Sequence, residues 1–272
     1  MTIGREPAEA HTDADVAVRA ARAGAAVARA RYGTGLRRVE HGGVDFSTDA
    51  DVAAERAIRG VLAELRPGDG IVGEELGASG GAARRWLVDP ICGTLNFAAG
   101  LPLFAVNVAL DVDGVTAAAA VVDPVAEETY WADGAGAWQR DASAVAGGGT
   151  DRPLAPTPAS RLVTVNLESG YPGPVVTRLL VDEAFRSRFS PRCLSSTLAL
   201  AWVATGRQAG YLTGGELRGS VHWTAAIALC RAAGAVVTNL AGGELHTGGH
   251  GLIAAADADT HAFLLETLER LR

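Results

Sequence analysis

The segment from Leu103 to Trp138 constrains the fold of this chain more than any other stretch. Its apolar runs alternate with Asp-Gly and Asp-Pro turns, as in "ALDVDGVTAAAAVVDPVAEETYWADGAGAW", and this alternation is typical of an antiparallel meander. Helical periodicity precedes it, from about Asp15 to Tyr32 after a cap at Thr12 or Asp13, and again after a Thr48 cap. Strand and helix patterns alternate beyond residue 160, with a helix expected from Val175 to Phe185. We therefore predict an α/β protein built around a sheet core.

The length of the chain allows one large domain or two closely packed subdomains, because 272 residues with 48% hydrophobic content can bury a large core. The stretch "GGGTDRPLAPTP", Gly147 to Pro158, has the composition of a linker or surface loop. We predict an N-terminal α+β subdomain over residues 1–150, which carries a metal and phosphate loop, and a C-terminal α/β subdomain over residues 151–272. The two would form a single compact unit.

Charge and composition exclude several classes of function. A net charge of -7 and a pI near 5.4 argue against binding to nucleic acid or to an anionic membrane surface. No apolar run reaches the roughly 18 residues of a membrane-spanning helix, and the first residues contain no apolar signal segment, so we expect a cytoplasmic protein. Cys92, Cys193 and Cys230 are odd in number, widely spaced and without C-x-x-C pairing, which argues against a disulfide framework and a structural zinc site. The chain contains no lysine, which excludes lysine-dependent Schiff-base and P-loop chemistry.

Acidic residues follow predicted strand ends or begin a predicted helix. Asp51 lies in the first turn of the helix after Thr48, Glu74 follows the short strand "GIVG", and Asp89 ends the strand "RRWLVD". Ligands of open α/β sheets bind at strand ends, and carboxylates that converge there suit Mg²⁺. Each of these acids taken alone is equally compatible with a solvated turn. Together they predict a cation-binding pocket.

The order of five motifs resembles the inositol monophosphatase family. The motifs are "DFSTDADVAAERAI", "GIVGEELG", "WLVDPICGTLNFAAGLPLFAVNVAL", "VVDPVAEETYWADGAGAW" and "HWTAAIALCRAAGAVVTNLAGGEL". The resemblance extends over nearly the whole chain. It implies the layered α-β-α-β-α sandwich of the sugar phosphatases, Mg²⁺-dependent hydrolysis of a small phosphorylated substrate, and a homodimer.

The resemblance also implies roles for individual residues. Glu74, Asp89 and the backbone carbonyl of Ile91 match the ligands of the first metal. Asp51 and Thr94 match the pair that orients the water attacking phosphorus, and Glu74 counts with them as a catalytic residue. The backbone N–H groups of Gly93 and Thr94, at the start of a short helix, would hold the phosphate.

Two metal-ligand positions depart from the family pattern, and Ala209 departs at a position where family members commonly have aspartate. Cys92 stands where the family has the second aspartate of Asp-Pro-Ile-Asp-Gly-Thr, and Thr224 in "HWTAA" is aligned with the aspartate of Trp-Asp-x-Ala-Ala. In the family both aspartates bind a second metal together with the residue matching Asp89. A thiolate is a soft ligand and a threonine hydroxyl carries no charge. We therefore predict one Mg²⁺ site and the loss of the second.

The roles of the residues near the substituted positions stay open. Cys92 could be a nucleophile with a pKa lowered by a helix N-terminus, or a small buried side chain that fills the position of the lost carboxylate. His222 could be an acid–base group or a replacement metal ligand, or it could serve only in capping or packing. We expect Cys92, His222 and Thr224 to line the substrate pocket with Gly93 and Thr94.

Three functions follow from these residues. The first is a divergent enzyme of the inositol monophosphatase type that acts on a small phosphorylated or polyol-like metabolite, its hydrolysis altered by Cys92 and Thr224. The second is a fold repurposed for non-hydrolytic acid–base chemistry, such as cyclisation, elimination or isomerisation. The third is a catalytically silent binding or regulatory protein. Retention of Asp51, Glu74 and Asp89 argues against the third, because acids are costly to bury together without a use.

Overall fold

The computed structural model describes residues 11–42, 45–81, 83–140, 151–167, 174–247 and 250–272. Its helices are α1 (Asp13–Arg31), α2 (Asp49–Leu65), α3 (Thr94–Ala98), α4 (Pro174–Val181), α5 (Glu183–Arg188), α6 (Thr197–Ala204), α7 (Thr224–Ala232) and α8 (Ala258–Leu271). Its strands are β1 (Arg38–Gly42), β2 (Asp45–Thr48), β3 (Gly70–Gly73), β4 (Gly77–Ser79), β5 (Arg84–Cys92), β6 (Ala105–Val112), β7 (Val115–Asp123), β8 (Glu128–Asp133), β9 (Gly136–Arg140), β10 (Arg152–Pro153), β11 (Leu162–Val165), β12 (Ser190–Cys193), β13 (Gly210–Thr213), β14 (Val236–Thr238) and β15 (Leu252–Ala255).

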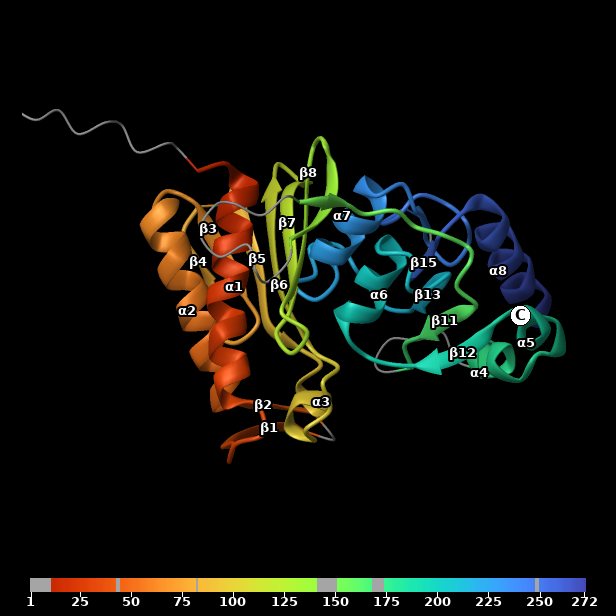
Figure 1. The fold of residues 1–272 in the computed structure, drawn as a ribbon, viewed down its shortest axis with the longest axis horizontal. Helices are drawn as coiled ribbons and strands as arrows, with labels where there is room; N and C mark the ends of the chain where they lie inside the picture. The colour runs from red at the N-terminus through yellow and green to blue at the C-terminus, as the bar shows by residue number, and fades with distance from the viewer. Residues whose placement is uncertain (1–10, 43–44, 82, 141–150, 168–173, 248–249) are drawn as a thin grey trace, which may run out of the picture.

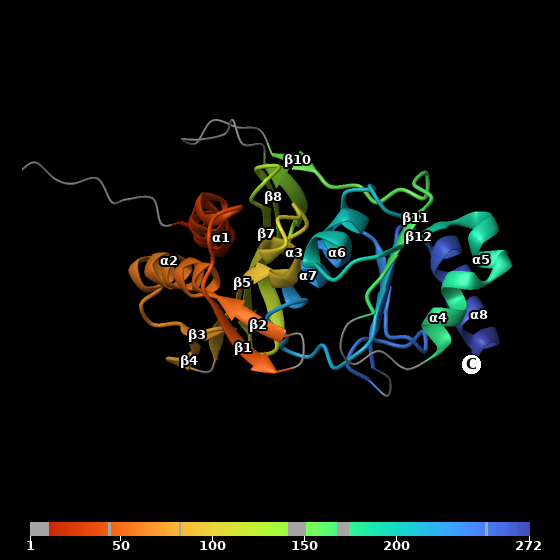
Figure 2. The same cartoon turned by 90° about the horizontal axis from the view of Figure 1, so that it is seen from below.

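Apart from α3 and from β1 and β2, which pair as a separate two-stranded sheet, these elements form five layers, seen edge-on in Figures 1 and 2. Helices α1 and α2 cover the outer face of an eight-stranded sheet of order β10-β9-β8-β7-β6-β5-β3-β4. Helices α6 and α7 lie between this sheet and a five-stranded sheet of order β12-β11-β13-β15-β14. Helices α4, α5 and α8 cover the far face of the second sheet. The predicted α-β-α-β-α sandwich is confirmed.

Two capping boxes begin the helices of the first layer. The hydroxyls of Thr12 and Thr48 cap α1 and α2, and the third helical residue of each helix, Asp15 or Asp51, accepts a bond back from the cap residue's N–H. The Thr48 cap agrees with the sequence analysis, and Thr12 is one of the two caps that it offered for α1. In α2 the capping box also fixes the position of a predicted site residue, because Asp51 supplies its carboxylate.

The predicted meander is β6 to β9, and its pairing continues into β5. Strands β5, β6, β7, β8 and β9 are joined in antiparallel register, and Asp89 of β5 faces Asn107 of β6. The ladder between β5 and β6 is regular as far as Asp89 and irregular between Asp89 and Cys92. Such a bulge bends a strand and re-aims its side chains. The end of β5 therefore leaves the regular sheet where the predicted metal loop begins.

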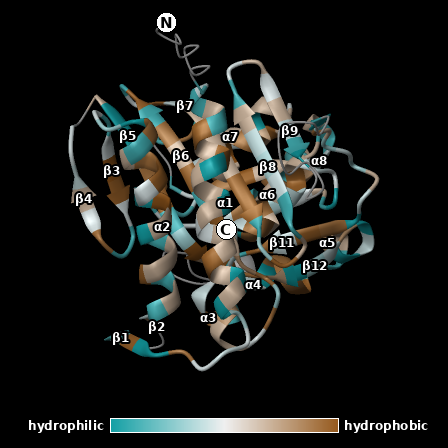
Figure 3. Ribbon diagram, turned by 60° about the vertical axis from the view of Figure 1, so that its left-hand side comes forward, coloured by the Kyte–Doolittle hydropathy of each residue, from teal (hydrophilic) through white to brown (hydrophobic). Residues whose placement is uncertain are grey.

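Helix α6 of the middle layer is apolar on all sides because sheets cover both faces of that layer. All residues of α6 except Trp202 are buried, and Figure 3 shows hydrophobic residues along α6 and the neighbouring strands. One core cluster contains Leu87 of the first sheet, Leu200 of α6, Leu229 of α7 and Leu252 of the second sheet. A continuous core thus joins both sheets. None of the described helices is long and apolar enough to cross a membrane.

Some elements differ from the sequence analysis. The single helix expected from Val175 to Phe185 is divided into α4 and α5, because Asp182 caps α5 by accepting from the N–H of Phe185. Strand β12 was not predicted. Residues 147–150 of the predicted linker lie outside the described residues, and β10, within the rest of that linker, pairs with β9. The subdomain boundary near residue 150 stays a prediction.

Candidate functional site

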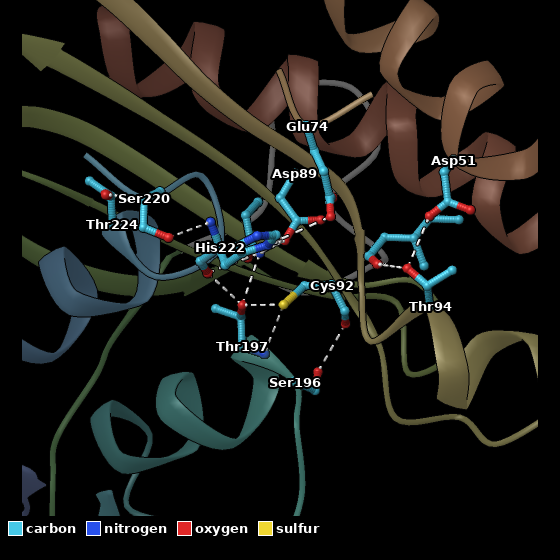
Figure 4. A network of polar contacts seen from close by, with 12 residues as sticks. Asp51, Glu74, Asp89, Cys92, Thr94, Ser196, Thr197, Ser220, His222 and Thr224 are labelled. Atoms are coloured by element: carbon cyan, nitrogen blue, oxygen red, sulfur yellow. Dashed lines mark hydrogen bonds and ion pairs between the residues drawn. The ribbon is translucent and has the colours of Figure 1, made fainter. Parts of the chain in front are cut away.

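The predicted site residues come from four segments that meet at one edge of the first sheet (Figure 4). Strands β3 and β5 are parallel neighbours, and Gly73 pairs with Val88. Glu74, directly after β3, therefore lies beside Asp89, and its N–H donates to the carbonyl of Val88 over 3.1 Å. The N-terminus of α2 brings Asp51, and the turn before α7 brings His222.

Asp51 is fully buried and receives several hydrogen bonds. Its Oδ2 accepts from the N–H of Thr48 at 2.8 Å and from the Thr48 hydroxyl at 2.5 Å. The hydroxyl of Thr94 lies 3.2 Å from Asp51 Oδ1 and 3.1 Å from the carbonyl oxygen of Ile91, and its single hydrogen can go to either. Burial raises the pKa of Asp51 to about 6, although the bonds from Thr48 oppose the shift. The structure thus brings the predicted Asp51–Thr94 pair together.

Glu55 supports the turn that carries Glu74. Its carboxylate is fully buried and accepts from the N–H of Glu75 at 2.7 Å, the N–H of Leu76 at 3.2 Å and Nε of Arg59 at 2.7 Å. The backbone after β3 is therefore fastened to α2. Glu55 thus positions the turn, and nothing in the sequence analysis assigned it this role.

Glu74 and Asp89 place two acids next to each other. Burial and the neighbouring charge of Asp89 raise the pKa of Glu74, whose side chain is 30% exposed. Asp89 is fully buried, and its Oδ1 has no hydrogen-bond partner. A buried carboxylate oxygen of this kind is costly unless a cation or donor completes it. Together with the carbonyl oxygen of Ile91, these oxygens are a donor set that fits Mg²⁺.

Asp89 also contacts His222. The Nδ1 atom of His222 lies 2.8 Å from Asp89 Oδ2 and 3.9 Å from Glu74 Oε1. Burial by itself lowers the pKa of His222, but bonds to Asp89 and Cys92 and the charges of Asp89 and Glu74 outweigh it and raise the pKa to about 12. The contact with Asp89 and the neighbouring charges therefore favour the protonated form of His222.

Cys92 ends β5 and points toward α6. Its Sγ lies 2.7 Å from the hydroxyl of Thr197 and accepts from the N–H of Thr197 at 3.3 Å. Burial, followed by the charge of Asp89, raises the pKa of the Cys92 thiol to about 11. This shift is opposite to the one that activates a nucleophilic cysteine.

The structure separates Thr224 from the acidic cluster. Thr224 is the first residue of α7, and its hydroxyl donates to the carbonyl of Ser220 over 2.7 Å (Figure 4). It also lines a cavity of about 670 Å³ that does not include Asp89 or Cys92. In the turn before α7, His222 is the side chain that reaches Asp89, two residues before the position that the sequence analysis aligned with the family aspartate.

Two contributing residues were missed in the sequence analysis. Asn107 lies in the middle of β6, and its Nδ2 donates to Thr197 Oγ1 at 2.9 Å and to Asp89 Oδ2 at 3.4 Å. Asn107 is the single polar residue in the run "FAVNVAL", a pattern that could have indicated a buried polar function. Thr197, in the first turn of α6, carried no comparable signal.

Comparisons with known proteins agree with this fold. The profile of the inositol monophosphatase family matches residues 9–272. The chain is 34% identical over 251 residues to an inositol-1-monophosphatase of Mycobacterium leprae, covering 88% of this chain and 83% of that protein. An inositol-1-monophosphatase of Mesorhizobium japonicum is 34% identical over 212 residues, 74% of each chain.

Solved structures show the same architecture. The extragenic suppressor protein suhB from Bartonella henselae matches with a TM-score of 0.79 and 27% identity, covering 94% of this chain and 98% of that one. The Thermotoga maritima IMPase TM1415 matches with a TM-score of 0.77 and 22% identity over 94% and 96% of the two chains, a likeness of fold alone. The chain belongs to the inositol monophosphatase family, whose phosphatases depend on Mg²⁺.

Proposed function

We propose that this protein hydrolyses a phosphate monoester of a small polyol-like metabolite, with Mg²⁺ held by Glu74, Asp89 and the carbonyl of Ile91. The observation that carries the proposal is the pair of adjacent acids, in which a buried oxygen of Asp89 has no partner. Mg²⁺ at these oxygens would neutralise charge on the phosphate and lower the pKa of a coordinated water.

Asp51 and Thr94 would orient the attacking water. The Thr94 hydroxyl lies between the carbonyl of Ile91 and the Asp51 carboxylate, so it can accept from a water while it donates to either oxygen. Asp51 is held rigidly by two bonds from Thr48 and is placed to take a proton from that water. The role of the Gly93 and Thr94 N–H groups in phosphate binding stays a prediction. They lie at the start of α3, and a helix of five residues is too short to support an anion site by itself.

A second candidate is non-hydrolytic acid–base chemistry in the same pocket. The raised pKa values of Asp51 and Glu74, and that of Glu75, which burial and the Asp51 charge raise to about 7, favour it. A carboxyl group protonated near neutral pH can act as a general acid. This chemistry would persist in the presence of a chelator, whereas the Mg²⁺-dependent phosphatase would lose its activity.

Phosphate release from a panel of small phosphate esters, including inositol 1-phosphate, tests the proposal. We expect Mg²⁺-dependent release that a chelator abolishes and that Asp51→Asn or Glu74→Gln lowers by at least about 100-fold. Asp49→Asn is the matched control, because Asp49 lies in the same helical turn but is paired with Arg31 at the surface. Release that is unchanged in both site variants, or absent with every ester, would contradict the proposal.

The assembly and location of the protein are also proposals. We infer a homodimer and a cytoplasmic location, both from the resemblance and the composition. Light scattering during size exclusion measures the first directly.

A further inference from the structure

We propose that Asp89, Cys92 and His222 form a binding site for Zn²⁺. Their ligand atoms all lie within 4.8 Å of one another. Among the residues that the structure describes, no other group of three or more His, Cys, Asp and Glu side chains converges in this way.

The donor set decides which metal would bind. A thiolate, an imidazole and a carboxylate are the ligands that Zn²⁺ uses in proteins. Mg²⁺ takes oxygen ligands in octahedral geometry and has little affinity for sulfur or nitrogen. The loss of the second carboxylate at Cys92 therefore replaces a hard oxygen site by a borderline one, with His222 as its third ligand.

A metal held by these three side chains would keep one coordination position open, on the side where His222 is exposed. Asp89 and Cys92 are buried at the end of β5, whereas the His222 side chain is 43% exposed. Asp89 Oδ1 has no partner, and Asp89 Oδ2 holds His222 Nδ1 at 2.8 Å, a contact that a metal would replace. Three protein ligands plus one open position are the pattern of catalytic rather than structural zinc sites.

Surrounding hydrogen bonds hold the ligands in place. The N–H of Thr197 donates to Cys92 Sγ at 3.3 Å, and a backbone donor of this kind favours the thiolate. Nδ2 of Asn107 contacts both Asp89 Oδ2 at 3.4 Å and Thr197 Oγ1 at 2.9 Å. Outer partners of this type orient metal ligands and raise metal affinity.

Binding has a defined proton balance. Zn²⁺ forms bonds to Sγ of Cys92, a ring nitrogen of His222 and an oxygen of Asp89, while the thiol proton and the extra imidazolium proton pass to solvent. The affinity for Zn²⁺ should therefore rise with pH.

Metal titration of the full chain tests the site without any substrate. The purified protein is stripped with a chelator, then titrated with Co²⁺ by absorption spectroscopy and with Zn²⁺ by calorimetry. We expect one equivalent of each, with a thiolate-to-cobalt charge-transfer band. Cys92→Ser should abolish the band, and both Cys92→Ser and His222→Gln should weaken Zn²⁺ binding by at least about 100-fold, since outer-shell partners alone change affinity by 10–100-fold.

Two further variants complete the design. Cys193→Ser removes an exposed thiol in β12 and must leave the band intact. The double variant Cys92→Asp with His222→Asp replaces the sulfur and nitrogen donors by carboxylate oxygens, so the site should then prefer Mg²⁺ to Zn²⁺. Circular dichroism verifies the fold of each variant, and His222→Gln provides an independent readout if Cys92→Ser does not fold.

The proposal is overturned if the wild-type protein shows no charge-transfer band, or if Cys92→Ser retains both the band and the Zn²⁺ affinity. Neither result affects the proposed phosphatase, whose Mg²⁺ ligands include Glu74 and Ile91 and whose test is phosphate release. A protein that binds Zn²⁺ but releases no phosphate would support this site and contradict the proposed function.

Discussion

Gly93 lies between Cys92 and Thr94, and its backbone links the two halves of the site. Its φ is +106°, a value that side-chain-bearing residues rarely adopt, and a Cβ placed on it would meet the carbonyl oxygen of Leu103 at 2.9 Å. Both conditions require glycine at this position. The turn that aims Cys92 toward α6 and Thr94 toward Asp51 therefore depends on a residue without a side chain.

Gly93→Ala should destabilise the protein and lower phosphate release together. Gly100→Ala is the control, because Gly100 has a φ of +76° but no atom within 4 Å of the point where an alanine Cβ would lie. Gly100→Ala incurs only the backbone cost, about 1–2 kcal/mol. Gly93→Ala adds the clash to this cost, so urea unfolding should show a larger loss of free energy of unfolding. Equal losses in the two variants would show that the loop around Gly93 relaxes freely.

The secondary-structure elements that could be predicted are those encoded by a short stretch of neighbouring residues. The Thr12 and Thr48 caps, the meander and the acidic strand ends depend on short stretches of sequence, and the structure contains them. The parallel pairing of β12 with β11 was not predictable, because it depends on residues about 28 positions apart and carries no turn signal.

The site itself shows the same limit. Asp51 and Thr94 are brought together as the resemblance implied. Whether His222 or Thr224 contacts Asp89 depends on the backbone conformation of the turn before α7. Side chains two positions apart in such a turn point in different directions. Sequence alignment by motif placed Thr224 in the site, whereas the contact to Asp89 is made by His222.

The link between α2 and the turn after β3 makes a prediction about Glu55. Glu55→Gln replaces one acceptor oxygen by an NH₂ group, which must then face a backbone N–H or the Arg59 guanidinium. We expect a loss of about 1.5–3 kcal/mol in the free energy of unfolding and weaker Mg²⁺ binding, measured by urea unfolding and calorimetry. Glu64→Gln, at an exposed position of the same helix, should change neither. Unaltered Mg²⁺ binding in a destabilised Glu55→Gln would limit Glu55 to a structural role.

At the scale of the whole molecule, the middle helices and one ion pair join the two sheets. Arg207, in the turn between α6 and β13, donates to both carboxylate oxygens of Glu128 on β8 at 2.5 Å and to the hydroxyl of Tyr130 at 2.8 Å. This bidentate contact connects segments on either side of the predicted subdomain boundary. With the shared core cluster, it predicts that the two halves unfold as one unit.

Calorimetry across pH tests this coupling. The hydrogen bond from Arg207 holds the pKa of Glu128 below its usual value in the folded protein. The pair therefore stabilises the fold fully when the pH is above the pKa of Glu128 in the unfolded chain, about 4.3. This stabilisation is lost as the pH falls through the lower pKa of the folded state. At pH 7, Glu128→Gln should therefore lower the midpoint of a single unfolding transition, and the difference from the wild type should shrink below about pH 4. Glu127→Gln, whose pairing with Arg29 is more exposed, should have a smaller effect. Two separate transitions, or a difference between Glu128→Gln and wild type that does not depend on pH, would show that this contact does not couple the halves.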